Sequence, residues 1–501
     1  MARYKHTDIE EGQSIFLTVN LKEQLMPGTF EYMLNDLVGG EIDISAFDEN
    51  YNNDKTGSKA IPPEALIKLI IYGYYKGIKS SRKIQDLSKE NVIARALTGD
   101  MDMHWTTIAN FISGNSENFK KVFTETLMYC AELDLIGGET FAEDGRRMQS
   151  NASIEMSGTK EELRKRLGMF KKMADKHVAK HLKRDALGEL REDKRNYEKR
   201  QKHLKRQIDK ISDFLETMEP KEGKNAAEIK SNVTDNESAM IHSSKGYIQG
   251  YIGLAVADKK NQIIVHAQAA GTANEGEHLP EMIDGTLNNL KEAGVKPPEG
   301  KKPVFMGDAN YFSGENLKAC EERGVEAIIP DSQFNKRPDE NNEKRFGYEA
   351  FTYHEDGDYY ECPNGKRLEY KRKETLGKEE GSVYEASGKD CGACPLKTRC
   401  VRAKKHKGLY DRGRKLFIIK SELKILRDRM RQKLATEEYR NQYAYRIQII
   451  EPVFANITYC KGLDRFTLRG QKKVNGQWNL YCILHNLGKC LAEYNKKMNA
   501  A

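Results

Sequence analysis

The chain has 501 residues, too many for one simple core, which predicts roughly two to four domains. Its formal net charge of +8 favours an anionic partner without identifying one. The sequence has no run of about 18 apolar residues and no apolar signal region after the N-terminus, so we expect a cytoplasmic protein without a membrane span. In a reducing compartment the nine cysteines favour metal binding over disulfides.

Residues 1–120 are predicted to form a helical domain. An apolar segment over 63–77 begins with proline, which suits a first helical turn because its missing N–H has no partner there. Shorter helices follow within 80–97. Short helices with tight turns can form a helix-turn-helix, with Arg82 and Lys83 available for phosphates. A plain helical bundle with ordinary surface charge fits equally well.

Residues 159–218 are crowded with Lys, Arg and Glu and contain no proline. Apolar residues recur there every seven positions, as in a coiled coil: Leu190, Tyr197, Leu204 and Ile211, with Ile208 and Leu215 in the alternate seam position. Gly168 and Gly188 fit an antiparallel helical hairpin as well as one long helix. A solvated surface is a simpler interpretation of the charges than a dedicated DNA-binding surface.

The remaining elements predict an α/β core with a mixed sheet. In chain order they are a strand over 138–144, a hairpin of strands over 247–258 and 263–268, a helix over 278–293, a strand over 303–306, a helix over 314–323 and a strand over 325–329. Residues 331–415 are polar and rich in turns. Helices are expected over 423–434, 437–450 and 478–495.

Three acidic residues have contexts that suit metal ligands: Asp144 and Asp308, each at the end of a predicted strand beside a glycine, and Glu451 on a helix. Two-metal phosphoryl transfer needs several carboxylates within a few ångströms of each other, and strand ends hold such side chains firmly. A strand-terminal Asp is also an ordinary turn former, so spacing alone does not decide between these interpretations.

Four cysteines of the polar segment suit a tetrahedral structural Zn²⁺ site: Cys362, Cys391, Cys394 and Cys400. Free thiols are the alternative interpretation. Basic residues follow closely from Arg399 to Arg414, so this module could also hold DNA. Trp105 and Trp478 could stack on a flipped base, although core packing explains a tryptophan more often.

Several blocks of sequence, taken in order, resemble the DDE-type transposases of bacterial insertion sequences, which have an RNase H-like catalytic core. The blocks are Ile61–Phe111, Glu143-Asp144-Gly145 with Asn151-Ala152-Ser153, Asn232–Asp235 with Gly246-Tyr247, Gly307–Phe312 with Glu315-Asn316-Leu317, Tyr443-x-x-Arg446 with Glu451–Phe454, Arg465–Gly470, and His485-Asn486-Leu487. Each block alone is weak, but their joint order is specific, and the resemblance covers nearly the whole chain.

The resemblance implies a domain plan for an α/β protein. It comprises a helical DNA-end-binding domain (1–120), the first part of the RNase H-like core (121–157), a coiled-coil or helical-hairpin insertion (158–225), the second part of the core (226–330), a Cys-rich zinc-type insertion (331–415) and a C-terminal helical part that carries the catalytic Glu (416–501).

The resemblance also implies a function: binding of terminal inverted repeats, then metal-dependent DNA cleavage and strand transfer. Asp144, Asp308 and Glu451 are then the catalytic ligands of two Mg²⁺ or Mn²⁺ ions, and synapsis of two ends implies a homodimer, with the coiled coil as a candidate interface. The residues expected to contact DNA are Tyr443, Arg446, Lys461, Arg465, Arg469, Arg82 and Lys83. Two alternatives remain: a domesticated nuclease or recombinase that does not integrate, and a non-catalytic DNA-binding regulator.

The chain departs from the family pattern around Glu451. Arg446 lies five residues before Glu451 instead of four, which turns it by roughly 140° around a helix. Pro452 is expected to kink or restart the helix. Thr458 stands where the family often has a phosphate-binding Lys, a role that Lys461, Arg465 or Arg469 would take over.

Overall fold

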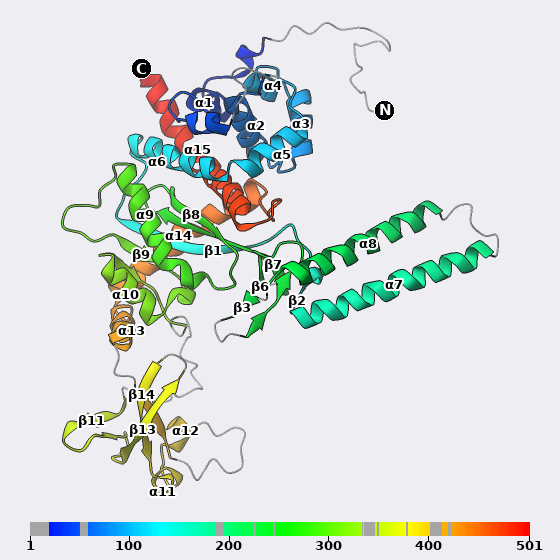
Figure 1. The fold of residues 1–501 in the computed structure, drawn as a ribbon. Helices are drawn as coiled ribbons and strands as arrows, with labels where there is room; N and C mark the ends of the chain where they lie inside the picture. Colours follow the sequence, from blue (N-terminus) through cyan, green and yellow to red (C-terminus); the bar gives the residue numbers. More distant parts are fainter. Residues whose placement is uncertain are drawn as a thin grey trace, which may run out of the picture. The chain divides into compact units, whose positions relative to one another are not determined.

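The structure is a computed structural model that describes residues 20–50, 59–186, 194–219, 221–223, 227–243, 246–332, 334, 346–347, 350–376, 379–400, 413–418 and 422–500 (Figure 1). The chain divides into two compact units. The first comprises Met1–Glu275, Asp284–Lys301 and Ile447–Ala501, and the second comprises Gly276–Ile283 and Lys302–Arg446. No helix among the described residues is long and apolar enough to cross a membrane.

The first unit begins with a group of helices, in agreement with the sequence. They are α1 (Phe30–Leu37), α2 (Pro63–Tyr75), α3 (Ser81–Glu90), α4 (Val92–Thr98), α5 (Trp105–Gly114) and α6 (Ser116–Glu132), with 3-10 turns η1 (Lys22–Gln24) and η2 (Ser45–Asn50). Helix α2 has Pro at its start and is buried from Ala65 to Tyr74. The Asn91 side chain caps α4 by accepting a hydrogen bond from the Ala94 N–H.

An antiparallel sheet of β1 (Thr140–Gln149), β6 (Ala239–Ser243), β7 (Gly246–Asp258) and β8 (Ile264–Ala270) forms the core of this unit. Strand β7 pairs with each of the other three and is buried from Gln249 onward. The predicted hairpin of β7 and β8 is confirmed. The predicted end of the first strand at Asp144 is wrong, because β1 pairs with β7 as far as Gln149 opposite Gly250. Asp144 therefore lies within the strand.

Helix α15 (Gln471–Ala500) runs along β8 and uses side-chain amides to bond the backbone of that strand. Asn486 bonds both the N–H and the C=O of Ile264, and Asn475 accepts from the Ala269 N–H. A strand edge left with unpaired backbone groups would be a site for aggregation. These amides occupy that edge.

Helix α14 (Glu437–Ala455) passes through Pro452 and continues as a π-helix, η9 (Asn456–Cys460). The helix therefore does not restart at Pro452, which was one of the two expected outcomes. Proline removes the N–H that would bond the carbonyl of Gln448, four residues earlier. The Gln262 side chain, in the turn between β7 and β8, donates to this carbonyl at 2.8 Å and replaces the missing partner.

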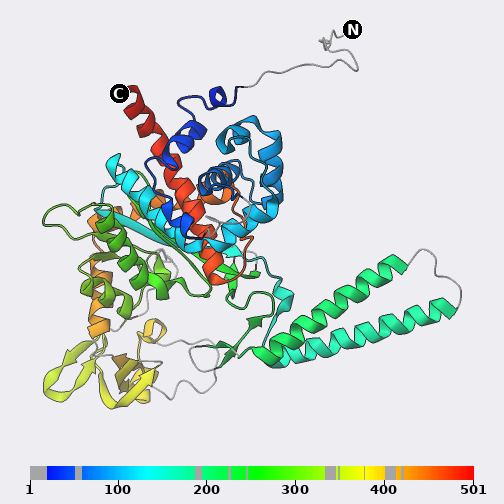
Figure 2. The ribbon, with the colours of Figure 1, turned by 45° about the horizontal axis from the view of Figure 1, so that its top comes forward.

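Two long antiparallel helices, α7 (Lys160–Ala186) and α8 (Lys194–Thr217), form a hairpin that we call the arm (Figures 1 and 2). Of the predicted seam residues, Leu204 and Ile211 are buried, while Leu190 lies outside the described residues. The seam is covered by α7 of the same chain. Short elements lie around the base of the arm: η3 (Ile154–Met156), β2 (Ser157–Gly158) paired with β5 (Ser231–Asn232), and β3 (Lys221–Glu222) paired with β4 (Glu228–Ile229).

The second unit contains a parallel pair of strands and a separate antiparallel sheet. The parallel pair is β9 (Val304–Met306) and β10 (Glu326–Ile328), accompanied by η5 (Ala309–Tyr311), α10 (Gly314–Glu322) and α13 (Glu422–Lys433). Helix α9 (Leu279–Glu292) has residues in both units, as does α14. Parallel and antiparallel pairings both occur, which agrees with the predicted α/β class.

The segment expected to be only polar and turn-rich contains a five-stranded antiparallel sheet. Its strands are β11 (Thr352–His354), β12 (Tyr359–Glu361), β13 (Arg367–Leu376), β14 (Glu379–Ala386) and β15 (Lys415–Ile418), with a 3-10 turn η7 (Glu355–Gly357) and the short helices α11 (Gly388–Gly392) and α12 (Lys397–Cys400). We call β11–β15 with α11 and α12 the cysteine module. The sequence reading missed these strands because most described side chains of β13 are polar and exposed.

Candidate active site and cysteine pocket

Asp144 is half-buried on β1, opposite Ala255 of β7, and its Oδ1 accepts a hydrogen bond from the Gly145 N–H at 2.8 Å. The neighbouring Gly145 is required by crowding. A Cβ there would lie 2.5 Å from the carboxylate of Glu275 and 2.6 Å from Ile252 Cγ2. The acid therefore sits on a strand whose backbone is tightly surrounded, which fixes its position.

The sheet face that carries Asp144 is covered by Trp478 of α15. Side chains alternate between the faces of a strand, so Asp144 and Met148 point to the same side. A Cβ on Gly253 would lie 2.7 Å from Met148 Cε and 3.1 Å from the Trp478 ring, so the indole lies on that side too. The Trp478 N–H also donates to the Leu254 carbonyl at 2.8 Å.

Glu451 is exposed on α14, one turn before Phe454. The Phe454 ring stacks on Trp478, with centroids 6.4 Å apart and an interplanar angle of 16°. Residues three apart on a helix lie on neighbouring parts of its surface. The last turns of α14 thus pack, through Trp478, over the sheet face that carries Asp144.

Asp308 lies in the second unit, two residues after β9, as the sequence predicted. It is half-buried and caps η5. Its Oδ1 accepts from the Asn310 N–H at 2.7 Å, and its Oδ2 accepts from the Asn310 side-chain amide at 3.0 Å. Both carboxylate oxygens are thus oriented by one neighbour, Asn310.

The three acids are divided between the units: Asp144 and Glu451 belong to the first and Asp308 to the second. Within the part of the chain that the structure describes, no group of three or more His, Cys, Asp or Glu side chains is arranged to hold a metal ion. Convergence of the three acids therefore stays a prediction.

Two of the arginines expected at DNA hold the backbone after β1. Arg465 donates to the Ser150 carbonyl at 3.1 Å, and Arg469 donates to the Asn151 carbonyl at 2.7 Å. The Phe466 N–H also donates to the Gln149 carbonyl, at 2.9 Å. The 465–469 loop is therefore fastened directly to the strand that carries Asp144.

Lys461 lies over the ring of Tyr75, 4.0 Å from its centroid. Burial, and secondarily the charge of Lys76, lowers its pKa. Lys79 of the helical region donates to the Gly462 carbonyl at 3.2 Å, and burial followed by the charge of Arg465 lowers the pKa of Lys79. Cations from the N-terminal helices and from the 461–465 segment therefore form one group within the first unit.

The other residues expected to contact DNA have different surroundings. Tyr443 is half-buried, with its ring edge-on to Phe334. Arg446 is 6% exposed, whereas Glu451 is exposed, which agrees with the different helix faces expected from their spacing. Arg82 and Lys83 are exposed on α3, and the Arg82 guanidinium lies 4.7 Å from the centroid of Trp105.

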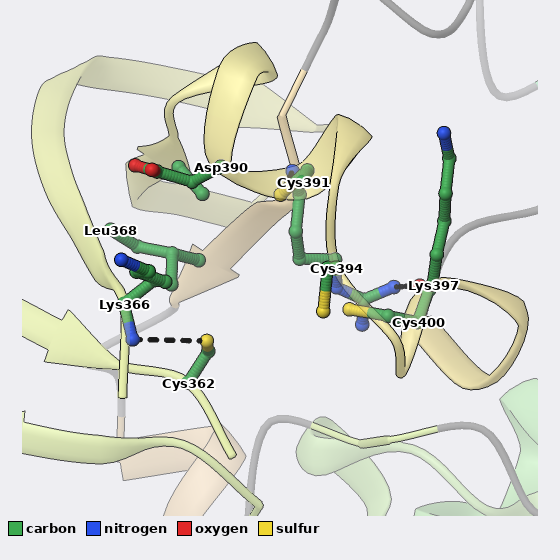
Figure 3. A pocket seen from close by; sticks show the side chains of 10 residues that line it. Cys362, Lys366, Leu368, Asp390, Cys391, Cys394, Lys397 and Cys400 are labelled. Atoms are coloured by element: carbon green, nitrogen blue, oxygen red, sulfur yellow. Dashed lines mark hydrogen bonds between the residues drawn. The ribbon is translucent and has the colours of Figure 1, made fainter. Parts of the chain in front are cut away.

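The four predicted cysteine ligands line one pocket in the second unit, with Lys366, Lys397 and Arg414 among the other lining residues (Figure 3). Backbone N–H groups point at two of the sulfurs: Lys366 donates to Cys362 Sγ at 3.4 Å and Arg414 donates to Cys391 Sγ at 3.3 Å. Burial raises the pKa of the Cys400 thiol, and the charge of Arg414 opposes this.

Sequence reasoning missed a polar cluster on the face of β1 opposite to Asp144. Glu143 is fully buried, and Glu275 is 3% exposed. Arg147 pairs with the Glu275 carboxylate at 3.4 Å and donates to the His242 carbonyl at 2.8 Å. The Glu143-Asp144-Gly145-Arg146-Arg147 run was a visible signal for a polar cluster, but its partner Glu275 is more than 120 residues away in sequence.

The fold and this site define an α/β protein with one acid within a strand of a central sheet, a second on a helix packed over that sheet, and a third after a short strand of the second unit. Residues 361–491 match the family described as Transposase DDE domain, and residues 19–114 match the family described as Transposase domain (DUF772). A search of curated proteins finds no match to the chain. Each match covers less than half of the chain, and together they support a DDE-type transposase of the insertion-sequence kind.

Proposed function

We propose that this transposase binds the terminal inverted repeats of its own insertion sequence and catalyses their cleavage and transfer to new DNA. The observation that carries the proposal is the packing of α14 through Phe454 and Trp478 over the sheet face of Asp144, within a chain that matches two transposase families. The packing supports the inference that Glu451 and Asp144 act in one region of the first unit, and Asp308 of the second unit would complete the set.

Asp144, Asp308 and Glu451 would hold two Mg²⁺ or Mn²⁺ ions. Carboxylate oxygens are the ligands these hard cations prefer, and none of the three acids is buried. When bound, the ions activate an attacking oxygen and stabilise the leaving oxygen of a phosphodiester. The protein's own contribution is positional. Gly145 lets the strand pack closely around Asp144, and Asn310 fixes the direction of the Asp308 carboxylate.

DNA contact is proposed for two regions of the first unit. On α3, Arg82 and Lys83 are exposed and free to meet phosphates of the transposon end. The second region is the group of Lys461, Lys79 and Arg465 beside the loop that Arg469 holds at the end of β1, in which Lys79 also pairs with Asp464. Tyr443 and Arg446 are proposed to contact DNA from the part of α14 that belongs to the second unit. Tyr443 is half-buried and Arg446 is buried, so this role requires their side chains to become exposed.

We also propose that the cysteine pocket holds a structural Zn²⁺ ion through Cys362, Cys391, Cys394 and Cys400. The support is that all four thiols line one pocket and that two of them receive backbone N–H donors, which stabilise thiolates. Binding would draw the four sulfurs together. The ion would join α11 and α12 to the turn between β12 and β13.

The proposed chemistry is tested with purified full-length protein, paired DNA ends and Mg²⁺. We expect cleavage and joining by the wild-type protein, and a loss of at least about 100-fold in Asp308→Asn with retained end binding, because the amide cannot replace an anionic metal ligand. Lys318→Gln, a surface change on α10 near Asp308 in sequence, is the matched control. Cleavage without joining would favour the nuclease alternative, and end binding without any cleavage would favour the regulator. Cleavage that survives Asp308→Asn would overturn the assignment of the acids.

A further inference from the structure

The positive charge of the arm is concentrated in its outer half. Residues 171–186 of α7 and 194–206 of α8 carry thirteen Lys and Arg against three acidic residues. Residues 160–170 and 207–217, at the base, carry five of each sign. The outer half alone therefore has a formal charge of +10, more than the +8 of the whole chain.

The balanced base is built as an ordinary folded element. Leu163 and Ile211 are buried in an apolar cluster with Met156. Ion pairs join Lys165 to Glu161 at 2.6 Å and Lys230 to Glu162 at 3.2 Å. Charge at the base is thus locally neutralised.

The outer half is held together by other means. Tyr197 of α8 stacks with two histidines of α7, with ring centroids 4.9 Å from His177 and 3.6 Å from His181. The Gln201 amide lies 3.3 Å from His177 Nδ1. This stack fixes the two helices against each other without using any Lys or Arg.

The cations of the outer half face solvent. Every Lys and Arg there whose side chain is described is exposed, and among those side chains no ion pair joins one of them to a carboxylate. Burial, then the charges of Arg200, His181 and Lys180, lowers the pKa of His177, as expected where positive charge accumulates. Such mutual repulsion is unfavourable unless an anionic partner relieves it.

The length of the charged part of α7 suits a polyanion with a regular repeat. The sixteen residues of α7 from 171 to 186 span about 24 Å at 1.5 Å per residue, which is about the length of seven base pairs of duplex DNA. A membrane surface fits less well because it needs one apolar helix face. The exposed apolar residues of α7 form two pairs on roughly opposite sides, Met169 with Met173 and Val178 with Leu182.

We propose that the outer half of the arm binds the phosphate backbone of duplex DNA, independently of base sequence and separately from the end-recognition helices and the acids. The inference rests on the proposed function only for the choice of duplex DNA as the polyanion. The exposed cations of both helices would displace counterions from the duplex, so each phosphate contact adds about 0.9 to the salt dependence of binding.

The test compares two charge-reversal variants of the full-length protein with equal changes in net charge. The outer variant is Lys180→Glu with Lys202→Glu. The base control is Arg164→Glu with Lys210→Glu. All four side chains are exposed. Binding to a 30-base-pair duplex of unrelated sequence is measured by fluorescence anisotropy between about 50 and 200 mM salt, with circular dichroism to verify helix content.

We expect the outer variant to bind at least about tenfold more weakly and to lose about two from the magnitude of the salt slope, with the base control within about twofold of wild type. Equal weakening of both variants, or of neither, would overturn the proposal. So would loss of binding to anionic phosphatidylserine vesicles with duplex binding intact. Paired-end cleavage is scored separately, so a protein that binds duplex through the arm but never cleaves ends would refute the proposed function alone.

Discussion

The sheet of the first unit and the sheet of the cysteine module are stabilised in different ways. Strand β7 is buried from Gln249 onward, and the adjacent β8 receives amide hydrogen bonds from Asn475 and Asn486 of α15. The module has a small apolar cluster and strands whose outer faces are polar. Residues distant in sequence thus stabilise the first sheet, whereas the second depends on its own small apolar cluster and, in our proposal, on a bound Zn²⁺ ion.

The largest effect is expected from removing the proposed zinc. Structural Zn²⁺ contributes about 10–16 kcal/mol in small zinc-binding peptides, so chelation or Cys391→Ser is expected to unfold the cysteine module locally. Hydrogen exchange should rise in β13 and β14 and stay unchanged in β7. Cys460→Ser, an exposed thiol outside the module, is the control. Wild-type protein that contains no zinc and keeps its protection after chelation would contradict the site.

The second largest effect is expected in the sheet of the first unit. Trp478→Ala is expected to cost about 3–5 kcal/mol, because it removes a fully buried ring and leaves the Leu254 carbonyl without its donor. Hydrogen exchange in β7 measures the loss, and the module should be unaffected. Trp105→Ala, at a half-buried ring stacked on Arg82, is the milder control. A small loss of unfolding free energy in Trp478→Ala would argue against a role in core packing. It would favour the alternative that Trp478 stacks on a flipped base.

A third prediction concerns how the stability of the fold changes at acidic pH. Burial lowers the pKa of His485 to about 4, and burial likewise lowers that of His266 to about 4. The unfolded chain then binds more protons than the folded one between pH 6.5 and about 4, so stability falls as the pH falls through this window. A change from 6.5 to about 4 corresponds to about 3 kcal/mol.

His485→Gln should remove its part of this pH dependence, measured by urea unfolding at pH 7 and pH 4.5. The first unit carries His485, which is 1% exposed, and the half-buried His266, whereas the described histidine of the module, His354, has a side chain that is 38% exposed. A pH slope that is the same in the variant and in the wild type would show that His485 is not buried in its neutral form.

The smallest predicted effect concerns the helix that carries Glu451. Gln262→Ala is expected to cost about 1–3 kcal/mol by leaving the Gln448 carbonyl without a donor. Pro452→Ala restores a backbone N–H four residues after Gln448, so the same Gln262 change should cost less in that background. A double-mutant cycle by urea unfolding measures the difference. Equal costs in both backgrounds would mean that Gln262 does not compensate for the proline.

The sequence by itself determined the elements whose signals are local. The proline and apolar run of α2, the polar turn between β7 and β8, and the Gly-Asp step after β9 all lie within a few residues, so each was predicted at its observed place. The heptad pattern of α8 likewise predicted a helical partner. The resemblance to transposases came from the order of short blocks, and two family matches bear it out.

Only the tertiary structure decided features that depend on distant partners. Strand β1 continues past Asp144 because β7, more than 100 residues later, pairs with it. Helix α14 continues through Pro452, and Gln262 donates to the carbonyl that the proline leaves without its usual helix partner. The strands of the cysteine module pair with one another, although most of their described side chains are polar. Their sequence therefore lacks the alternation of apolar and polar residues that predicts a strand. Backbone pairing and hydrogen-bond replacement are long-range, and a sequence pattern reports only the side chains that are near in the chain.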